Sequence, residues 1–193
     1  MRVINWIFWV LILSIILPSC QEVDYVPKPI GYARIDFQDH EFKKYEADCP
    51  FSFEYGGLSN LVEVNAKNNA ECWFNLEYSK QKAKVHFSYL PIGELKVESL
   101  IKDARRLALE HLSKADDFEE TAVIDTAQNV YGIVYDFKGS TASNLQFYLT
   151  DSLNYFVRGA LYFEVTPKAD SLAPAEKYIE EDLRHLINTF TWK

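Results

Sequence analysis

The sequence predicts an α+β domain, in which a mainly antiparallel β-sheet has two long α-helices packed on it. Three observations support this fold class. Short segments rich in aromatic and β-branched residues occur in two runs, and each run is followed by a segment whose apolar residues recur at helical spacing. The connections between the later strands are short and polar, which suits hairpins better than long crossovers. Strands grouped in runs, with only two helices between and after them, are typical of α+β domains.

The first run of predicted strands fills the first half of the domain. Its segments are residues 32–37, 41–46, 51–55, 72–78 and 84–90. In the last segment Val85, Phe87 and Tyr89 alternate with polar residues, and this period of two predicts a strand with one buried face. A helical period replaces it over residues 94–111. The apolar positions of that helix predict a buried stripe made of Val97, Leu100, Ile101, Ala104, Leu107, Ala108 and Leu112.

The second run of predicted strands comprises residues 119–125, 130–137, 144–150 and 155–165. Its connections at 138–143 and 151–154 are short and polar, so they predict antiparallel hairpins. Two of these strands are predicted to bury one face each. The buried residues are Tyr131, Ile133, Tyr135 and Phe137 in one strand, and Tyr155, Val157, Leu161, Phe163 and Val165 in the other.

The second helix is predicted near the C-terminus. Asp170 or Ser171 can cap it, and Pro174 is tolerated within its first turn. Its buried stripe is predicted to consist of Ile179, Leu183, Leu186, Ile187 and Phe190. We expect the two helices to pack on opposite faces of the sheet.

The N-terminus predicts export and a lipid anchor. Residues 3–17 are almost entirely apolar and follow one basic residue, but about 22 Å of helix falls short of the roughly 30 Å hydrocarbon core of a bilayer. Such a segment is typical of a signal peptide. It ends in LPSC, which resembles a bacterial lipobox although Pro18 is not the favoured residue there. We therefore predict a signal peptide over 1–19 and acylation of Cys20, by palmitate among others; a short transmembrane helix is the alternative.

The anchored protein is predicted to lie in the cell envelope, outside the cytoplasm and most simply facing the periplasm. Several acyl chains on Cys20 would hold it stably on a membrane. Residues 20–31 contain two prolines that favour extended backbone, and they are predicted to form a tether of about 30 Å at most. A single globular domain is predicted to fill residues 32–193.

The two remaining cysteines, Cys49 and Cys72, are an even number in an oxidising compartment, which predicts a disulfide. Closing that loop should contribute about 3 kcal/mol to stability. Two buried free thiols are the alternative.

Neither catalysis nor a cofactor is predicted. The net charge of −8 argues against nucleic acid as a partner. The four histidines, His40, His86, His111 and His185, show no metal-ligand spacing and are predicted to lie on the surface or on a sheet face. No serine lies in a Gly-x-Ser-x-Gly elbow. The sequence thus predicts a protein that is not an enzyme and holds no metal.

Long ordered blocks of the sequence carry a family resemblance. They include DYVPKPIGYARIDF (24–37), DCPFSFEY (48–55), CWFNLEY (72–78), KVHFSYLPI (84–92), VYGIVYDFKGSTASNLQFYLTD (130–151) and FVRGALYFEVTPKADSLAP (156–174). Together they resemble the gliding motility lipoprotein family GldD of the Bacteroidetes. The resemblance implies a role in gliding over surfaces, a tie to the type IX secretion system, and protein partners in that machinery. It transfers one residue role, the acylation of Cys20, and no catalytic residue.

A tethered acidic domain without a catalytic constellation predicts an assembly or scaffold component that acts by contact. Because contact surfaces favour exposed arginine and tyrosine, we predict partner-binding residues at Arg34, Arg158 and Tyr162. Tyr25 and Tyr32 belong to the same N-terminal segment as Arg34.

Three alternatives remain open at the level of sequence. Arg158 can instead pair with an acid such as Glu164, while the tyrosines complete the core. The protein can be an envelope ligand-binding module, or a hydrolase, with a site that is not visible in the sequence. It can also be a lipoprotein that only stabilises the envelope.

Overall fold

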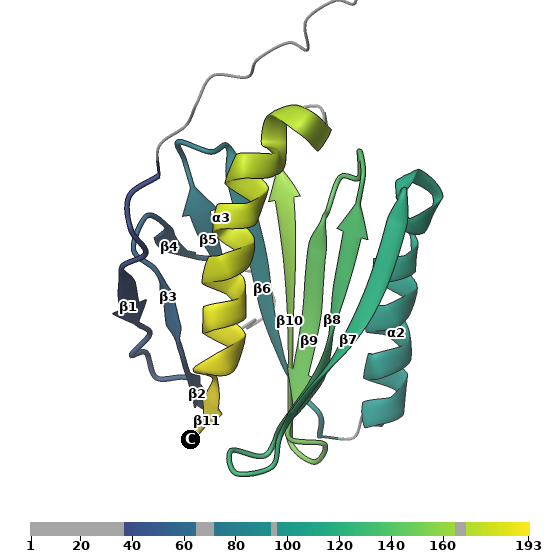
Figure 1. Cartoon of the computed structure of the whole chain (residues 1–193). Helices are drawn as coiled ribbons and strands as arrows, with labels where there is room; N and C mark the ends of the chain where they lie inside the picture. Colours follow the sequence, from purple (N-terminus) through teal and green to yellow (C-terminus); the bar gives the residue numbers. More distant parts are fainter. Residues whose placement is uncertain (1–36, 65–71, 94–95, 165–168) are drawn as a thin grey trace, which may run out of the picture. The chain divides into compact units, whose positions relative to one another are not determined.

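The computed structural model describes residues 37–64, 72–93, 96–164 and 169–193, and the main element of this part is a seven-stranded antiparallel sheet (Figure 1). The strand order is β4-β5-β6-β10-β9-β8-β7. Along the sheet these strands are β4 (Asn60–Glu63), β5 (Phe74–Tyr78), β6 (Ala83–Pro91), β10 (Tyr155–Phe163), β9 (Leu145–Thr150), β8 (Val130–Lys138) and β7 (Asp117–Asp125). The two central strands, β6 and β10, pair along their full length.

The path of the chain explains this order. Strands β4, β5 and β6 are neighbours in sequence and in the sheet. Helix α2 (Val97–Leu109) and the short 3₁₀ helix η1 (Leu112–Lys114) then lead the chain to β7 at the far edge. Hairpins return it through β8 and β9 until β10 lies beside β6. The centre of the sheet is therefore closed by a pairing between distant parts of the sequence.

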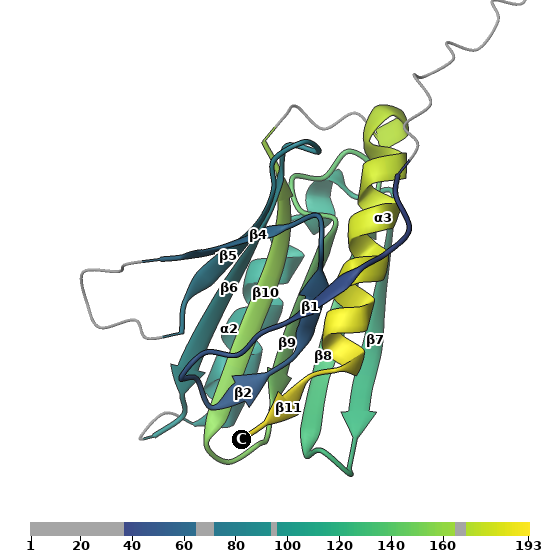
Figure 2. The same ribbon diagram turned by 90° about the vertical axis from the view of Figure 1, so that its left-hand side faces the viewer.

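Helix α3 (Ala169–Asn188) lies on one face of the sheet together with two small antiparallel sheets (Figure 2). One pairs β1 (Phe42–Lys44) with β3 (Glu54–Gly56), and the other pairs β2 (Phe51–Ser52) with β11 (Thr191–Trp192). The last strand therefore returns to residues near the start of the described domain.

The core on the α3 face is aromatic. Its buried rings stack or tilt on one another with centroid separations of 4.5 to 6.1 Å, and five of them are Phe51, Phe53, Phe74, Phe87 and Phe190. Aromatic pairs at such separations contribute beyond their buried area. The residues predicted as the buried stripe of this helix are all buried in this core, although the last of them follows the end of α3: Ile179, Leu183, Leu186, Ile187 and Phe190.

Helix α2 packs on the opposite face, as predicted, and this smaller core is closed by two alanines. Ala104 and Ala108 are buried against Tyr135, Tyr148 and Phe156. Their small side chains allow the helix to approach the aromatic rings closely. The α+β class, the mainly antiparallel sheet and the packing of the two helices on it are thus confirmed.

Several local predictions were wrong. Leu112 was assigned to the buried stripe of the first helix but is 44% exposed, because α2 ends at Leu109 and the 3₁₀ turn that follows changes the spacing of the side chains. Helix α3 begins at Ala169, ahead of the predicted start at Asp170 or Ser171, and Pro174 therefore lies beyond the first turn.

Two strands were missed. Strand β4 follows a glycine-rich stretch, and the two residues of β11 are too few to show a period. The predicted strand at 32–37 falls almost wholly outside the described residues, as do the signal peptide, Cys20 and the tether.

Candidate functional site

Helix α2 covers only part of its face of the sheet. It packs on β8, β9 and one end of β10, and polar residues of β5, β6 and β10 on the same face are left half-buried or exposed. We call this surface the open sheet face. It consists of Asn75, Glu77, Lys84, His86, Ser88, Arg158 and Tyr162.

The register of the strands places these side chains in rows. Tyr162 lies opposite Lys84, which lies opposite Glu77 on the next strand. The Lys84 Nζ is 3.1 Å from a carboxylate oxygen of Glu77 and 3.3 Å from one of Glu164. The hydrogen bonds that Lys84 donates to these two acids raise its pKa, although exposure to water keeps the pairs weak. The positive charge of Lys84 is therefore balanced locally.

Two histidine rings flank Tyr162. The ring of Tyr162 meets His86 edge-on at a centroid distance of 5.5 Å and His111 at 6.0 Å. The Nδ1 of His86 is 2.8 Å from the Oδ1 of Asn75. Partial burial lowers the pKa of both histidines, and for His86 the positive charge of Lys84 adds to this effect. Both rings are therefore neutral at neutral pH.

Arg158 is the unbalanced charge of the open sheet face. Its guanidinium donates to the Oε1 of Gln146 at 2.6 Å, and no ion pair found within the described residues includes it. Of the acids that were alternatives as its partner, Glu164 forms an ion pair with Lys84 and none with Arg158. Gln146 is 1% exposed, and its Nε2 has no partner in the described structure. The guanidinium thus has donors to spare for an acceptor that arrives from outside.

A second polar cluster, missed by the sequence analysis, joins the start of the domain to α3. His40 directs Nδ1 at the Oδ1 of the buried Asp182, at 2.7 Å, and Nε2 at Glu181, at 2.9 Å. Tyr78 donates to the other oxygen of Asp182 at 2.9 Å. We call these residues the histidine clasp. Asp182 lies three residues after Ile179 on α3, so an acid at buried-stripe spacing was the available signal.

The histidine clasp holds two segments of the chain together and lacks the arrangement of a hydrolase triad. An acid–histidine pair resembles two members of a hydrolase triad, but there the free ring nitrogen faces a hydroxyl nucleophile. Here that nitrogen faces the carboxylate of Glu181, which occupies the place that a nucleophile's hydroxyl would need. Burial raises the pKa of Asp182 even though bonds from His40 and Tyr78 pull it down. Gly56 provides the room, since a Cβ there would lie within 2.4 Å of the Asp182 carboxyl carbon.

The same segment is held to α3 by stacked rings. His40 stacks on Tyr178 at 4.1 Å, and Phe42 stacks on His185 at 3.6 Å between centroids. The Nε2 of His185 is 2.7 Å from a carboxylate oxygen of Glu54. The four histidines were predicted at the surface or on a sheet face, and two of them instead tie the first described residues to α3.

Cys49 and Cys72 form a disulfide, with 5.8 Å between their Cα atoms. The bond ties the start of β5 to the loop that precedes β2. Cys72 has a φ of 60°, a conformation that few non-glycine residues adopt, and the bond helps to hold it there.

The remaining predicted site residues lie outside the described part of the chain. These are Cys20 and Arg34, together with Tyr25 and Tyr32. Within the residues that the structure does describe, no group of three or more His, Cys, Asp and Glu side chains is placed to hold a metal ion. No helix of that part has the length and apolar character needed to cross a membrane.

Comparison with known proteins identifies a family. The family model described as "Gliding motility lipoprotein GldD" matches residues 22–192, which is nearly all of the chain. No curated protein sequence matches it. The solution structure of cyanobacterial PsbP from Synechocystis sp. PCC 6803 is similar over 86% of this chain and 99% of that chain, with 12% sequence identity and a TM-score of 0.49. At those values this likeness carries no argument.

Proposed function

This chain belongs to the GldD family of gliding motility lipoproteins, and from that premise we propose that it is a non-catalytic assembly or scaffold component of the gliding and type IX secretion machinery. Family membership implies a role in gliding motility and a lipid anchor in the envelope. We further propose that acyl chains on Cys20 hold the protein on a membrane, with the domain facing the periplasm behind the tether of residues 20–31.

The observation that carries this proposal is the unbalanced arginine of the open sheet face. Arg158 lies near Tyr162 and two neutral histidine rings, on the part of the sheet face that α2 leaves uncovered. Arginine and tyrosine are enriched among the residues that dominate binding energy at protein interfaces. A guanidinium with free donors also matches a carboxylate on a partner in a geometry that lysine cannot reproduce. The surface therefore supports function by contact with a protein.

Crosslinking in living cells tests this role. A photoreactive phenylalanine analogue placed at Tyr162 should capture a protein of the gliding or secretion machinery, whereas the same analogue at Leu153, which is 76% exposed in a turn, should not. Capture of the same proteins from both positions would reflect random collision and would remove the support for a specific contact surface.

The anchor is tested separately. Cys20→Ala should abolish the incorporation of labelled palmitate and leave the signal peptide in place. Labelling of that variant at the level of the unchanged protein would exclude Cys20 as the acylated residue. Fractionation of the membranes in the same experiment assigns the anchor to the inner or the outer membrane.

A further inference from the structure

The longest uncovered edge of the sheet is strand β7. Its nine residues pair with β8 on one side, and no strand of the described residues pairs with it on the other. Strand β4, at the opposite edge, has only four residues. An edge strand presents a row of free backbone donors and acceptors to any extended chain that comes beside it.

The direction of those free groups follows from the register. The Phe137 N–H donates to the Asn144 carbonyl, so odd-numbered residues of β8 direct their backbone groups at β9 and even-numbered residues direct theirs at β7. The partners of the even-numbered residues are the odd-numbered residues of β7. Glu120, Ala122 and Ile124 therefore direct their N–H and C=O groups away from the sheet.

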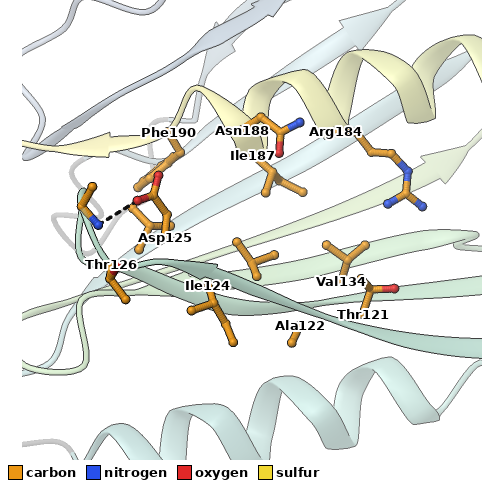
Figure 3. A pocket seen from close by; sticks show the side chains of 13 residues that line it. Thr121, Ala122, Ile124, Asp125, Thr126, Val134, Arg184, Ile187, Asn188 and Phe190 are labelled. Atoms are coloured by element: carbon orange, nitrogen blue, oxygen red, sulfur yellow. Dashed lines mark hydrogen bonds between the residues drawn. The ribbon is translucent and has the colours of Figure 1, made fainter.

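A groove runs beside this edge, between β7 and the C-terminal half of α3 (Figure 3). It encloses about 510 Å³. Figure 3 shows Arg184, Ile187 and Asn188 along α3, facing Thr121 and Val134 on the strands. Ile187 and Phe190 supply apolar walls, as do Val123, Val130 and Val134. Ile124, on the edge itself, is 72% exposed. The edge thus offers apolar contacts together with its backbone groups.

The charged side chains along β7 indicate which kind of strand could pair with this edge. Asp117, Glu119 and Asp125 belong to no ion pair in the described part of the chain, whereas Glu120 pairs with Arg105. The one cation at the groove, Arg184, is already paired with Asp136 and Glu180. A second copy of β7 would bring the same acids against these acids, and like charges opposite one another destabilise a pair of strands. A strand with basic residues would instead pair with them.

We propose that the β7 edge receives an extended, basic and apolar segment of a partner protein, which adds an eighth strand to the sheet. Backbone hydrogen bonds to Glu120, Ala122 and Ile124 hold the segment, its apolar side chains enter the groove against Val123 and Ile187, and its Lys or Arg residues meet Glu119 and Asp125. Recognition of this kind takes affinity from the backbone and specificity from alternate side chains. The proposed site at β7 uses different strands from the open sheet face, so the proposal does not depend on whether Arg158 contacts a partner.

A designed peptide tests the proposal on the full-length protein in detergent micelles. The blocked peptide KVIVTTKVK places lysine opposite Asp125, Glu119 and Asp117 when it runs antiparallel to β7, and EVIVTTEVE is its acidic counterpart. The basic peptide should bind at least tenfold more tightly. It should also slow hydrogen exchange at the amides of Glu120, Ala122 and Ile124, while the acidic peptide should not.

A matched pair of proline variants keeps the test independent of unfolding. Ala122→Pro removes an N–H that faces outward, a position where edge strands tolerate proline. It should weaken binding of KVIVTTKVK at least tenfold. Glu63→Pro makes the same change at the other edge, where the Val64 N–H donates to the Trp73 carbonyl and the Glu63 N–H faces outward, and it should leave binding unchanged. Glu119→Lys should weaken the basic peptide and strengthen the acidic one.

Three results would overturn the proposal. The first is equal binding of the two peptides. The second is binding of the basic peptide to the Ala122→Pro variant as tightly as to the unchanged protein. The third is protection of the Glu120, Ala122 and Ile124 amides from hydrogen exchange without any peptide. If that protection rises with protein concentration, the edge pairs with a second copy. If it does not, the edge is covered by residues of the same chain.

Discussion

The two faces of the seven-stranded sheet are covered in opposite ways. On one face, a twenty-residue helix and two small sheets bury a continuous aromatic core, including rings from β2, β3, β5, β6 and the residues after α3. On the other, a thirteen-residue helix closes a smaller core and leaves a polar surface on β5, β6 and β10. The α3 face gathers segments from both ends of the described chain, while the α2 face leaves side chains available.

This difference indicates that the α3 face mainly stabilises the fold, whereas the α2 face offers side chains for contact with a partner. Side chains on the α3 face are fixed by neighbours that lie far away in sequence, so a change there disturbs the whole domain. Side chains on the open sheet face are half-buried or exposed, so a change there alters the surface more than the fold. If the comparison is right, the effects of substitutions on the free energy of unfolding should fall in order from the aromatic core to the open sheet face.

The largest effect is expected for Phe51→Ala. Phe51 is 0% exposed, and its ring lies within 6.4 Å of Phe53, Phe87, Phe190 and Trp192. Removing it deletes buried contacts and leaves a cavity, which should lower the free energy of unfolding by about 3–5 kcal/mol. Denaturant unfolding measures this loss. A loss below about 1 kcal/mol would mean that the aromatic core is not what holds the domain.

The disulfide comes next. Replacing Cys49 and Cys72 together by alanine should lower the free energy of unfolding by about 2–5 kcal/mol, mainly because the unfolded chain gains freedom. The unchanged protein with reductant should show a similar loss, and the double variant should then be insensitive to reductant. If reductant destabilises the double variant as well, the effect does not come from this bond.

The sequence predicted the parts of the fold that repeat a simple period. Strands β6 and β10 alternate over nine residues, and α3 repeats its apolar positions over several turns, so each was found with its buried face. Strand β11 has only two residues, which are too few to show a period. Strand β11 forms because Trp192 meets Phe51 across the domain, and no local pattern encodes that pairing.

The candidate surfaces show the same limit. Arg158 and Tyr162 could be placed on the alternate face of their strand from the period of two. Helix α2 covers only part of this sheet face and so leaves the two residues accessible, but this follows from tertiary packing and not from the local sequence. His40 and Asp182 are separated by 142 residues, so only the fold brings them together. The free edge of β7 likewise depends on the strand order, and that order is set by the distant pairing of β6 with β10.

The histidine clasp should show a smaller effect with a defined dependence on pH. Asp182→Asn should lower the free energy of unfolding by about 1–3 kcal/mol, because a buried carboxyl group that is hydrogen-bonded to His40 and Tyr78 is lost. Burial raises the pKa of Asp182 in the folded state. A carboxyl of this kind stabilises the fold fully below its unfolded pKa of about 4 and loses that contribution as pH rises through its folded pKa. The deficit of the variant should therefore shrink as pH rises above about 4.

Asp151 provides the control with the opposite sign. Burial alone would raise its pKa, but backbone N–H groups of Tyr155, Asn154 and Leu153 donate to it and lower the pKa. Its contribution is present above the unfolded pKa of about 4 and is lost as pH falls through the folded value. Asp151→Asn should thus show a deficit that shrinks as pH falls. Deficits that do not change with pH in either variant would contradict the assigned shifts.

The smallest effect on stability, and the largest on function, is expected at Arg158. Arg158→Ala removes a half-buried side chain and one hydrogen bond to Gln146, so the free energy of unfolding should fall by about 1 kcal/mol. Gliding of cells that carry this variant should nevertheless be impaired at normal protein level, because the guanidinium is the group offered to the partner. Gln146→Ala removes the same hydrogen bond from the buried side and should destabilise the domain at least as much, yet it retains the arginine. Cells with Gln146→Ala should therefore glide. If both variants glide equally well or equally poorly, stability and not the charge of the open sheet face determines the outcome, and the partner contacts the protein elsewhere.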